Sequence, residues 1–246
     1  MGDLSNLLFE LSSDERLTIL KNLQKEKLKL SQVSQIQDIT APEASRHLQR
    51  LSDAKLISRD SNGFYFLTML GKLVFSQLST LSFISDHSEY FLSHDPSMLS
   101  YQFQNRIGEL SECRFDSDYV HNINHSAQMV KEAEDYLWCI TYQLPGLTTP
   151  VIEQRLDDGL EVKFIFPEGV QPSESIRLEV FRRCENRSIP RIEARIVLTD
   201  KEAQFGLISS DGKYDYAAFI SSDEKPRQLA RDVFKYYWER GKLLLL

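Results

Sequence analysis

The sequence predicts two folded parts of different class: an α+β domain over residues 1–82 and an α/β domain with a mixed sheet over residues 113–246. A helical segment, 83–112, joins them as a linker or dimerisation element. In the first part, leucine stripes at helical spacing alternate with capping signals and end in a hairpin pattern. In the second part, strand-like runs alternate with helical runs from residue 118 onward. The 246 residues are enough for two hydrophobic cores.

Residues 40–57 form the element around which the first domain is organised. Thr40 and Glu43 have the spacing of a capping box, which predicts a helix beginning there. One helix face is apolar and consists of Ala44, Leu48 and Leu51. The opposite face is polar and consists of Ser45, Arg46, Gln49 and Arg50. These polar side chains can donate to phosphates or to base edges in a major groove.

The next residues, 57–67, predict two short strands joined by Asn62-Gly63, a pair suited to a tight turn with positive φ. A polar-faced helix followed directly by a hairpin is typical of a winged helix-turn-helix, in which the helix enters the major groove and the wing contacts the backbone or minor groove. The predicted DNA contacts are Ser45, Arg46, His47, Gln49, Arg50, Lys55, Arg59 and Asn62.

Alternatives remain at this stage for several of these residues. The helix alone fits an ordinary amphipathic helix with a solvated face, and only the following hairpin favours DNA. His47 fits a phosphate contact and packing against the hairpin equally well. The lysines around the end of the helix that carries Leu17, Leu20 and Leu23 (21, 25, 27 and 29) fit favourable charge at a helix C-terminus better than phosphate contact.

The net charge of −7 is unevenly distributed. Residues 1–80 hold ten Lys/Arg and nine Asp/Glu, and the remainder holds 19 basic and 27 acidic residues. A near-neutral domain with local basic clusters can bind double-stranded DNA as a homodimer, because the local field matters more than the total charge. The acidic remainder needs another role.

Composition and targeting signals predict a cytoplasmic protein with no membrane partner. No apolar run approaches the ~20 residues that a membrane span requires. The first residues lack the basic start and apolar core of a signal peptide. Cys113, Cys139 and Cys184 are odd in number and lack C-x-x-C spacing, which favours reduced thiols.

The order of elements in the second half predicts an α/β fold. A helix over 68–79 is followed by further apolar residues to Leu92, and His94-Asp95-Pro96 is the predicted linker. Helices are predicted over 118–134, 149–158, 174–186 and 227–240. Strands are predicted over 136–142, 160–166, 191–199, 203–209 and 215–221.

Two stretches carry a resemblance to known families. The pattern over 11–20, 28–31 and 45–51, up to Gly63, closely resembles the archaeal ArsR/MarR-like winged-helix regulators. The runs 138–141, 159–163 and 195–206 resemble the middle domain of the methanogenesis regulatory protein family. Such effector domains are similar to half of a phospholipase D fold, as in the sugar-responsive TrmB regulators. The resemblance implies a DNA-binding dimer with a small-molecule effector.

The same resemblance bears on catalysis. Phospholipase D enzymes need an H-x-K motif followed by Asp, whereas the corresponding strand here is Arg195 to Lys201 and residues 126–246 contain no histidine. We therefore expect no enzymatic activity. His121 and His125 lie at i, i+4 but lack an apparent third ligand, so we expect neither a metal nor a cofactor.

A ligand site is expected at the carboxyl ends of the strands, where open α/β sheets bind ligands. The candidate rim residues are Tyr142, Gln143, Phe166, Asp200, Lys201 and Asp215. Burial in the hydrophobic core is the stronger alternative for Tyr142 and Phe166. Together these observations predict a sequence-specific transcriptional regulator whose C-terminal domain senses a small molecule or partner. The competing classes are a phospholipase D-like phosphodiesterase and a protein-interaction adaptor.

Overall fold

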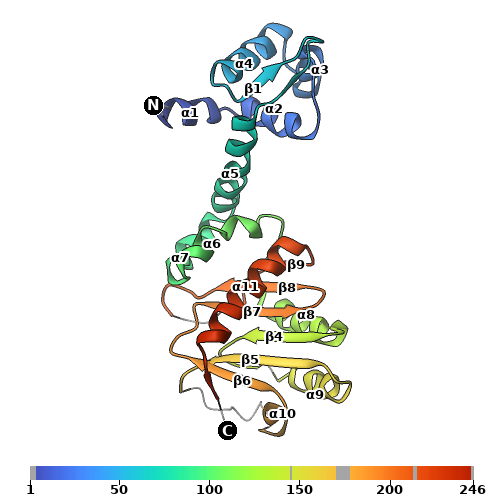
Figure 1. Cartoon of the computed structure of the whole chain (residues 1–246), viewed down its shortest axis with the longest axis vertical. Helices are drawn as coiled ribbons and strands as arrows, with labels where there is room; N and C mark the ends of the chain where they lie inside the picture. The colour runs from blue at the N-terminus through green and yellow to red at the C-terminus, as the bar shows by residue number, and fades with distance from the viewer. Residues whose placement is uncertain (1–3, 145, 170–177, 213–214, 245–246) are drawn as a thin grey trace. The chain divides into compact units, whose positions relative to one another are not determined.

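The computed structural model describes residues 4–144, 146–169, 178–212 and 215–244 (Figure 1). The chain divides into two compact units, Met1–Ser82 and Phe83–Leu246. None of the helices in these described ranges combines the length and the apolar character that a bilayer span demands.

The first unit is mainly helical. Its elements are α1 (Leu4–Leu11), α2 (Asp14–Lys25), α3 (Leu30–Gln37), α4 (Ala41–Asp53), β1 (Ile57–Arg59), β2 (Tyr65–Leu67) and the first part of α5 (Met69–Asp86). Its core is rich in leucine and includes the fully buried Leu48, Leu51 and Leu56. Leu28 forms a single antiparallel bridge to Tyr65 of β2, with backbone hydrogen bonds of 3.1 and 2.8 Å.

The start of α5 packs directly on the backbone of Leu56. The Thr68 hydroxyl donates to the carbonyl oxygens of Lys55 (2.7 Å) and Leu56 (3.2 Å), and it accepts from the Gly71 N–H at 2.9 Å. A Cβ at Gly71 would lie 1.9 Å from the Leu56 carbonyl oxygen. Glycine is therefore required at this position by the close approach of two backbones.

The second unit contains an eight-stranded mixed sheet in the order β10-β6-β5-β4-β7-β8-β9-β3 (Figure 1). Its strands are β3 (Arg114–Asp116), β4 (Tyr136–Ile140), β5 (Glu161–Pro167), β6 (Glu185–Ile189), β7 (Ala194–Thr199), β8 (Ala203–Leu207), β9 (Ala218–Ser221) and β10 (Lys242–Leu243). Its helices are α6 (Ser88–Ser93), η1 (Pro96–Met98), α7 (Tyr101–Gln104), η2 (Ile107–Leu110), α8 (Tyr119–Glu132), α9 (Thr149–Asp157), α10 (Leu178–Arg182) and α11 (Glu224–Arg240).

The sheet is buried on both faces, as the alternation along its central strands shows. Ile196 and Leu198 of β7 belong to a core cluster with α11, whereas Val197 belongs to a second cluster with residues of α8, α9 and α10. Strands β4, β5 and β6 are parallel, and the other pairings are antiparallel. The prediction of an α/β unit with a mixed sheet is confirmed.

Three predicted features differ in the structure. Residues 83–112, expected as a linker, contribute Phe83, Tyr90 and Leu110 to the core of the second unit. His94, expected in a chain break, is 5% exposed. The helix predicted over 174–186 corresponds to the short α10 and the strand β6, while 174–177 lie outside the described residues.

Candidate nucleic-acid interface

Helix α4 begins and ends through side-chain and backbone caps that its own sequence supplies. The Glu43 carboxylate accepts from the Thr40 N–H (3.0 Å), and the Glu43 N–H donates to the Thr40 hydroxyl (3.4 Å), which completes the predicted capping box. At the other end, the Leu56 N–H donates to the Leu51 carbonyl (3.0 Å) and Lys55 adopts φ +61°. This is a Schellman ending, in which glycine usually takes the left-handed position that Lys55 occupies here.

The face of α4 opposite the core is open to solvent. Ala44, Leu48 and Leu51 are fully buried, whereas Ser45, Arg46 and Gln49 are exposed. Within the described residues no acceptor binds Arg46, and Gln49 donates to Asp53 on the same helix at 2.7 Å. The three exposed side chains therefore form a polar surface with a free guanidinium.

Two predicted contact residues lie at the edges of this face. His47 is half-buried, its Nδ1 has no hydrogen-bond partner among the described residues, and burial lowers its pKa, so the imidazole is neutral at pH 7. Arg50 donates from Nε (2.9 Å) and Nη2 (2.7 Å) to the carboxylate of Glu10 in α1. Its Cζ lies 5.0 Å from the centre of the Phe9 ring. Arg50 is thus held by α1 and differs from the free Arg46.

The hairpin after α4 closes through Asp60. Strands β1 and β2 pair antiparallel, and the Asp60 carboxylate accepts from the N–H groups of Asn62 (3.0 Å) and Phe64 (3.0 Å). The hairpin is confirmed, but only Gly63 has positive φ (+86°), so the turn differs from the two-residue Asn-Gly type. Asn62 is exposed at the tip.

Each aromatic residue from 64 to 66 carries a cation over its ring. Lys29 lies over Phe64 (4.8 Å), Arg59 over Tyr65 (5.5 Å) and Lys27 over Phe66 (4.9 Å), measured to the ring centres. Lys27 also approaches the Asp60 carboxylate at 3.5 Å. Arg59 of β1 and two lysines that precede α3 therefore place three cations against the aromatic rings of the hairpin.

The six residues predicted to form a ligand rim are not brought together. Gln143 donates to the Tyr216 hydroxyl (3.1 Å), next to Asp215, at the carboxyl end of β4. Asp200 instead accepts from the N–H groups of Glu134 (2.9 Å) and Asp135 (3.2 Å), which precede β4. The remaining members are Tyr142, which donates to the Ile192 carbonyl, Lys201, which pairs with Glu134, and Phe166, which is fully buried.

Asp215 binds a buried histidine. His94 Nε2 lies 3.0 Å from Asp215 Oδ2, its Nδ1 lies 2.9 Å from the Tyr90 carbonyl, and its ring stacks on Tyr90 at 3.9 Å. Burial lowers the pKa of His94. The bonds to Asp215 and to the Tyr90 carbonyl, together with the nearby charge of Asp211, raise this pKa by more than burial lowers it, so the net shift is upward.

The stability of the second unit should therefore depend on pH. A histidine whose pKa is raised on folding stabilises the fold below its unfolded pKa, about 6.5, and this contribution is lost as pH rises through the folded pKa. We expect the melting temperature, followed by tryptophan fluorescence, to fall as pH increases above about 6.5. Asp215→Asn should remove most of this dependence. An unchanged pH profile in Asp215→Asn would contradict the assignment.

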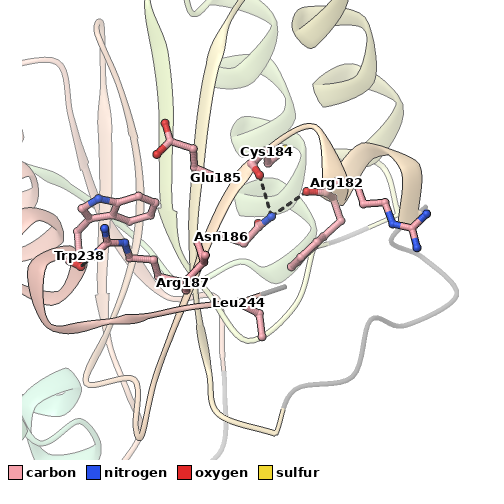
Figure 2. Close-up of a pocket in the computed structure, with 9 residues that line it drawn as sticks. Arg182, Cys184, Glu185, Asn186, Arg187, Trp238 and Leu244 are labelled. Atoms are coloured by element: carbon pink, nitrogen blue, oxygen red, sulfur yellow. Dashed lines mark hydrogen bonds between the residues drawn. The ribbon is translucent and has the colours of Figure 1, made fainter. Parts of the chain in front are cut away.

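A cavity of about 280 Å³ lies beside strand β6. It is lined by Phe181, Arg182, Cys184, Glu185, Asn186, Arg187, Trp238, Leu243 and Leu244. Asn186 donates from Nδ2 to the carbonyl oxygens of Phe181 (2.7 Å) and Cys184 (3.0 Å). Figure 2 shows its bond to Cys184. Arg187 lies over the indole of Trp238 at 4.7 Å. Burial raises the pKa of Cys184 to about 12, so this thiol is no thiolate nucleophile at neutral pH.

A second cavity, of about 400 Å³, lies at the carboxyl end of β6. It is lined by Met98, Leu99, Ser100, Ile189, Pro190, Arg191, Glu193, Tyr236, Tyr237 and Arg240. Arg191 and Arg240 are exposed, and the Tyr237 hydroxyl donates to the Glu193 carboxylate. Its lining combines apolar side chains with two guanidinium groups and the carboxylate of Glu193.

The sequence analysis predicted neither cavity, and it did not predict that Glu10 binds Arg50. The cavity residues come from segments far apart in the chain, and no local spacing connects them. Glu10 and Arg50 are 40 positions apart. The one available signal was the position of Glu10 at the end of a leucine-rich helix whose other polar residues carry no charge.

Comparison with known proteins gives distant structural likeness only. No family profile and no curated protein sequence matches the chain. TrmBL2, an archaeal chromatin protein with a novel mode of DNA binding, is 14% identical with a TM-score of 0.43, covering 89% of this chain and 88% of its own. NucT from Helicobacter pylori is 10% identical with a TM-score of 0.43, covering 51% of this chain and 92% of its own. Nuc from Salmonella typhimurium, a phospholipase D family member, is 10% identical with a TM-score of 0.38, covering 50% of this chain and 90% of its own.

Proposed function

We propose that the chain is a sequence-specific DNA-binding transcriptional regulator, and that α2, α3, α4 and the β1–β2 hairpin act as a winged helix-turn-helix. The observation that carries the proposal is the open face of α4, where Ser45, Arg46 and Gln49 are exposed and Arg46 has no partner among the described residues. Arginine and glutamine are the side chains that pair bidentately with guanine and adenine in the major groove.

The hairpin supports the same function. Its cations at Lys27, Lys29 and Arg59 can contact phosphates beside the helix, and Asn62 lies exposed at its tip. The first unit holds nearly equal numbers of basic and acidic residues, so DNA binding would depend on these local clusters. We place the acidic second unit outside the DNA interface.

Selection from random duplex DNA tests the proposal. The wild type should enrich an inverted repeat with half-sites about one helical turn apart. Arg46→Gln should weaken binding to that sequence by about 1–3 kcal/mol, measured by fluorescence anisotropy. Lys225→Gln removes the same charge from the exposed surface of α11 and should leave the affinity unchanged. Folded protein that enriches no sequence would overturn the proposal.

An exposed apolar face of α5 supports the proposal of a homodimer. Leu70, Leu73, Gln77 and Leu81, here called the α5 stripe, lie at spacings of three and four and share one helix face. The three leucines are 47, 63 and 55% exposed. Leu73 and Leu81 each lie four positions from Gln77, so an antiparallel second copy centred on Gln77 would place Leu73 against Leu81. We propose a second copy of this chain as the occupant of the stripe.

We further propose that the second unit senses a small molecule, and that the cavity of about 400 Å³ is its site. The cavity lies at a strand carboxyl end, where α/β sheets bind ligands. A ligand that prefers one arrangement of the dimer would shift its population and so its DNA affinity. Operator affinity measured across a panel of sugars and small carboxylates, with Arg191→Gln as the control, tests this role. The chain is proposed to lack phosphodiesterase activity.

A further inference from the structure

Glu10 lies in the last turn of α1 and contacts arginines from two other helices. Its carboxylate accepts from Nη2 (2.7 Å) and Nε (2.9 Å) of Arg50, and its Oε2 lies 3.4 Å from Nε of Arg16. The Glu10 side chain is only 17% exposed. The hydrogen bond from Arg50 lowers the pKa of Glu10, so the carboxylate is charged at neutral pH. One carboxylate is thus shared by two guanidinium groups, and the cluster keeps a net positive charge.

The position of α1 does not depend on this carboxylate alone. Arg16, which is 5% exposed, donates from Nε to the Glu10 carbonyl (2.5 Å) and from Nη2 to the Phe9 carbonyl (2.7 Å). These carbonyls belong to the last turn of α1, and that of Phe9 also accepts from the Ser12 N–H (3.4 Å) and hydroxyl (2.8 Å). Removing only the charge of Glu10 should therefore leave α1 anchored to α2.

The guanidinium of Arg50 is held along its Nε–Nη2 edge by Glu10 and on one flat face by the Phe9 ring. Glu10 uses its Nε–H and one Nη2–H, and the Phe9 ring lies 5.0 Å from its Cζ. A guanidinium has five N–H groups, so both Nη1 hydrogens and the second Nη2 hydrogen remain. The Nη1–Nη2 edge presents two nearly parallel N–H groups, the arrangement that binds paired acceptor atoms. The Arg50 side chain is 36% exposed, so this edge can be reached.

We propose that Glu10 is a positioning residue for DNA recognition, which holds Arg50 so that its Nη1–Nη2 edge meets two adjacent acceptor atoms of DNA. The acceptors are the O6 and N7 atoms of guanine or two oxygens of one phosphate. The inference rests on the proposed function. An unrestrained arginine loses rotamer freedom when it binds, whereas Arg50 loses that freedom when the unit folds.

The test is a double-mutant cycle on the sequence that the wild type selects, using Glu10→Gln, Arg50→Gln and the double variant. Glutamine keeps the shape of Glu10 and one acceptor oxygen but removes the charge. Glu26→Gln is the matched control, because Glu26 is exposed and has no arginine partner among the described residues. Circular dichroism melting checks that each variant folds.

We expect Glu10→Gln to weaken binding about tenfold, in the lower part of the range for one bidentate contact. Glu26→Gln should not weaken it. In the Arg50→Gln background, Glu10→Gln should have no further effect, because Glu10 acts only through Arg50. A loss that persists in that background would mean a structural role and overturn the inference. Tighter binding by Glu10→Gln would also overturn it, because the carboxylate would then be masking Arg50.

Two readouts identify the acceptor. If Arg50 contacts guanine, both single variants should lose base preference at the same G·C pair. If it contacts phosphate, base preference should stay and Arg50→Gln should lower the slope of log affinity against log salt by about one. Wild-type binding that Glu10→Gln leaves unchanged overturns this inference alone. Absence of wild-type binding overturns the proposed function as well.

Discussion

Replacing Gly71 by alanine is expected to lower the free energy of unfolding of the Met1–Ser82 unit by about 3 kcal/mol. The added Cβ would lie 1.9 Å from the Leu56 carbonyl oxygen and 2.9 Å from its carbon. Leu56 is fully buried, and its carbonyl accepts from the Thr68 N–H at 3.0 Å. Because the obstacle is backbone, no side-chain rotation relieves it, and the start of α5 must move away from the core.

The two tryptophans allow the effect to be assigned to one unit. Trp138 and Trp238 both lie in the Phe83–Leu246 unit, so tryptophan fluorescence follows that unit while far-ultraviolet circular dichroism follows both. Gly71→Ala should move the circular dichroism transition and leave the fluorescence midpoint unchanged. Gly206→Ala should lower the fluorescence midpoint, because its Cβ would lie 2.6 Å from the Ala217 carbonyl oxygen.

Gly146→Ala is the control for both variants, since nothing lies within 4 Å of its added Cβ. It should leave both transitions in place. If Gly71→Ala melted at the wild-type temperature, α5 would not lie so close to the Leu56 backbone that an added Cβ comes within 1.9 Å of its carbonyl oxygen.

The first unit was largely predictable because its signals are local. The capping box of Thr40 and Glu43 and the buried stripe of Leu48 and Leu51 each depend on residues a turn or two apart. The hairpin turn is also local, although Asp60, and not the Asn-Gly pair alone, closes it. The partner of Arg50 could not be predicted, because folding brings α1 to α4 and no spacing along the chain records that contact.

The second unit was predicted less completely because its polar strands look like helix or loop. Strand β6 contains Glu185, Asn186 and Arg187, and it is stabilised by pairing with β5 and by the Asn186 amide bonds to α10. The rim prediction failed for a topological reason. Strand β7 runs antiparallel to β4, so Asp200 at its end lies at the start of β4, away from Gln143.

The other large effect concerns the α5 stripe. Leu73→Glu is expected to convert the proposed dimer to a monomer and to weaken operator binding by about a hundredfold. In the antiparallel arrangement each introduced carboxylate would face a leucine of the second copy, and an unpaired carboxylate in an apolar interface costs about 3 kcal/mol or more. The symmetric dimer holds two such carboxylates, so a total of about 6 kcal/mol corresponds to a factor of about ten thousand in the dimer dissociation constant. A monomer would hold only one half-site at a time, so its affinity for the repeat falls as well.

Sedimentation equilibrium at matched concentrations measures the first effect, and fluorescence anisotropy on the inverted repeat measures the second. Ser79→Glu is the matched control, because Ser79 is exposed on the face of α5 opposite the stripe and the same charge there should leave the dimer intact. A Leu73→Glu protein that remains dimeric would assign the interface to another surface. If it is monomeric but keeps wild-type affinity for the repeat, a single copy recognises DNA, and the two-fold arrangement of α4 helices is wrong.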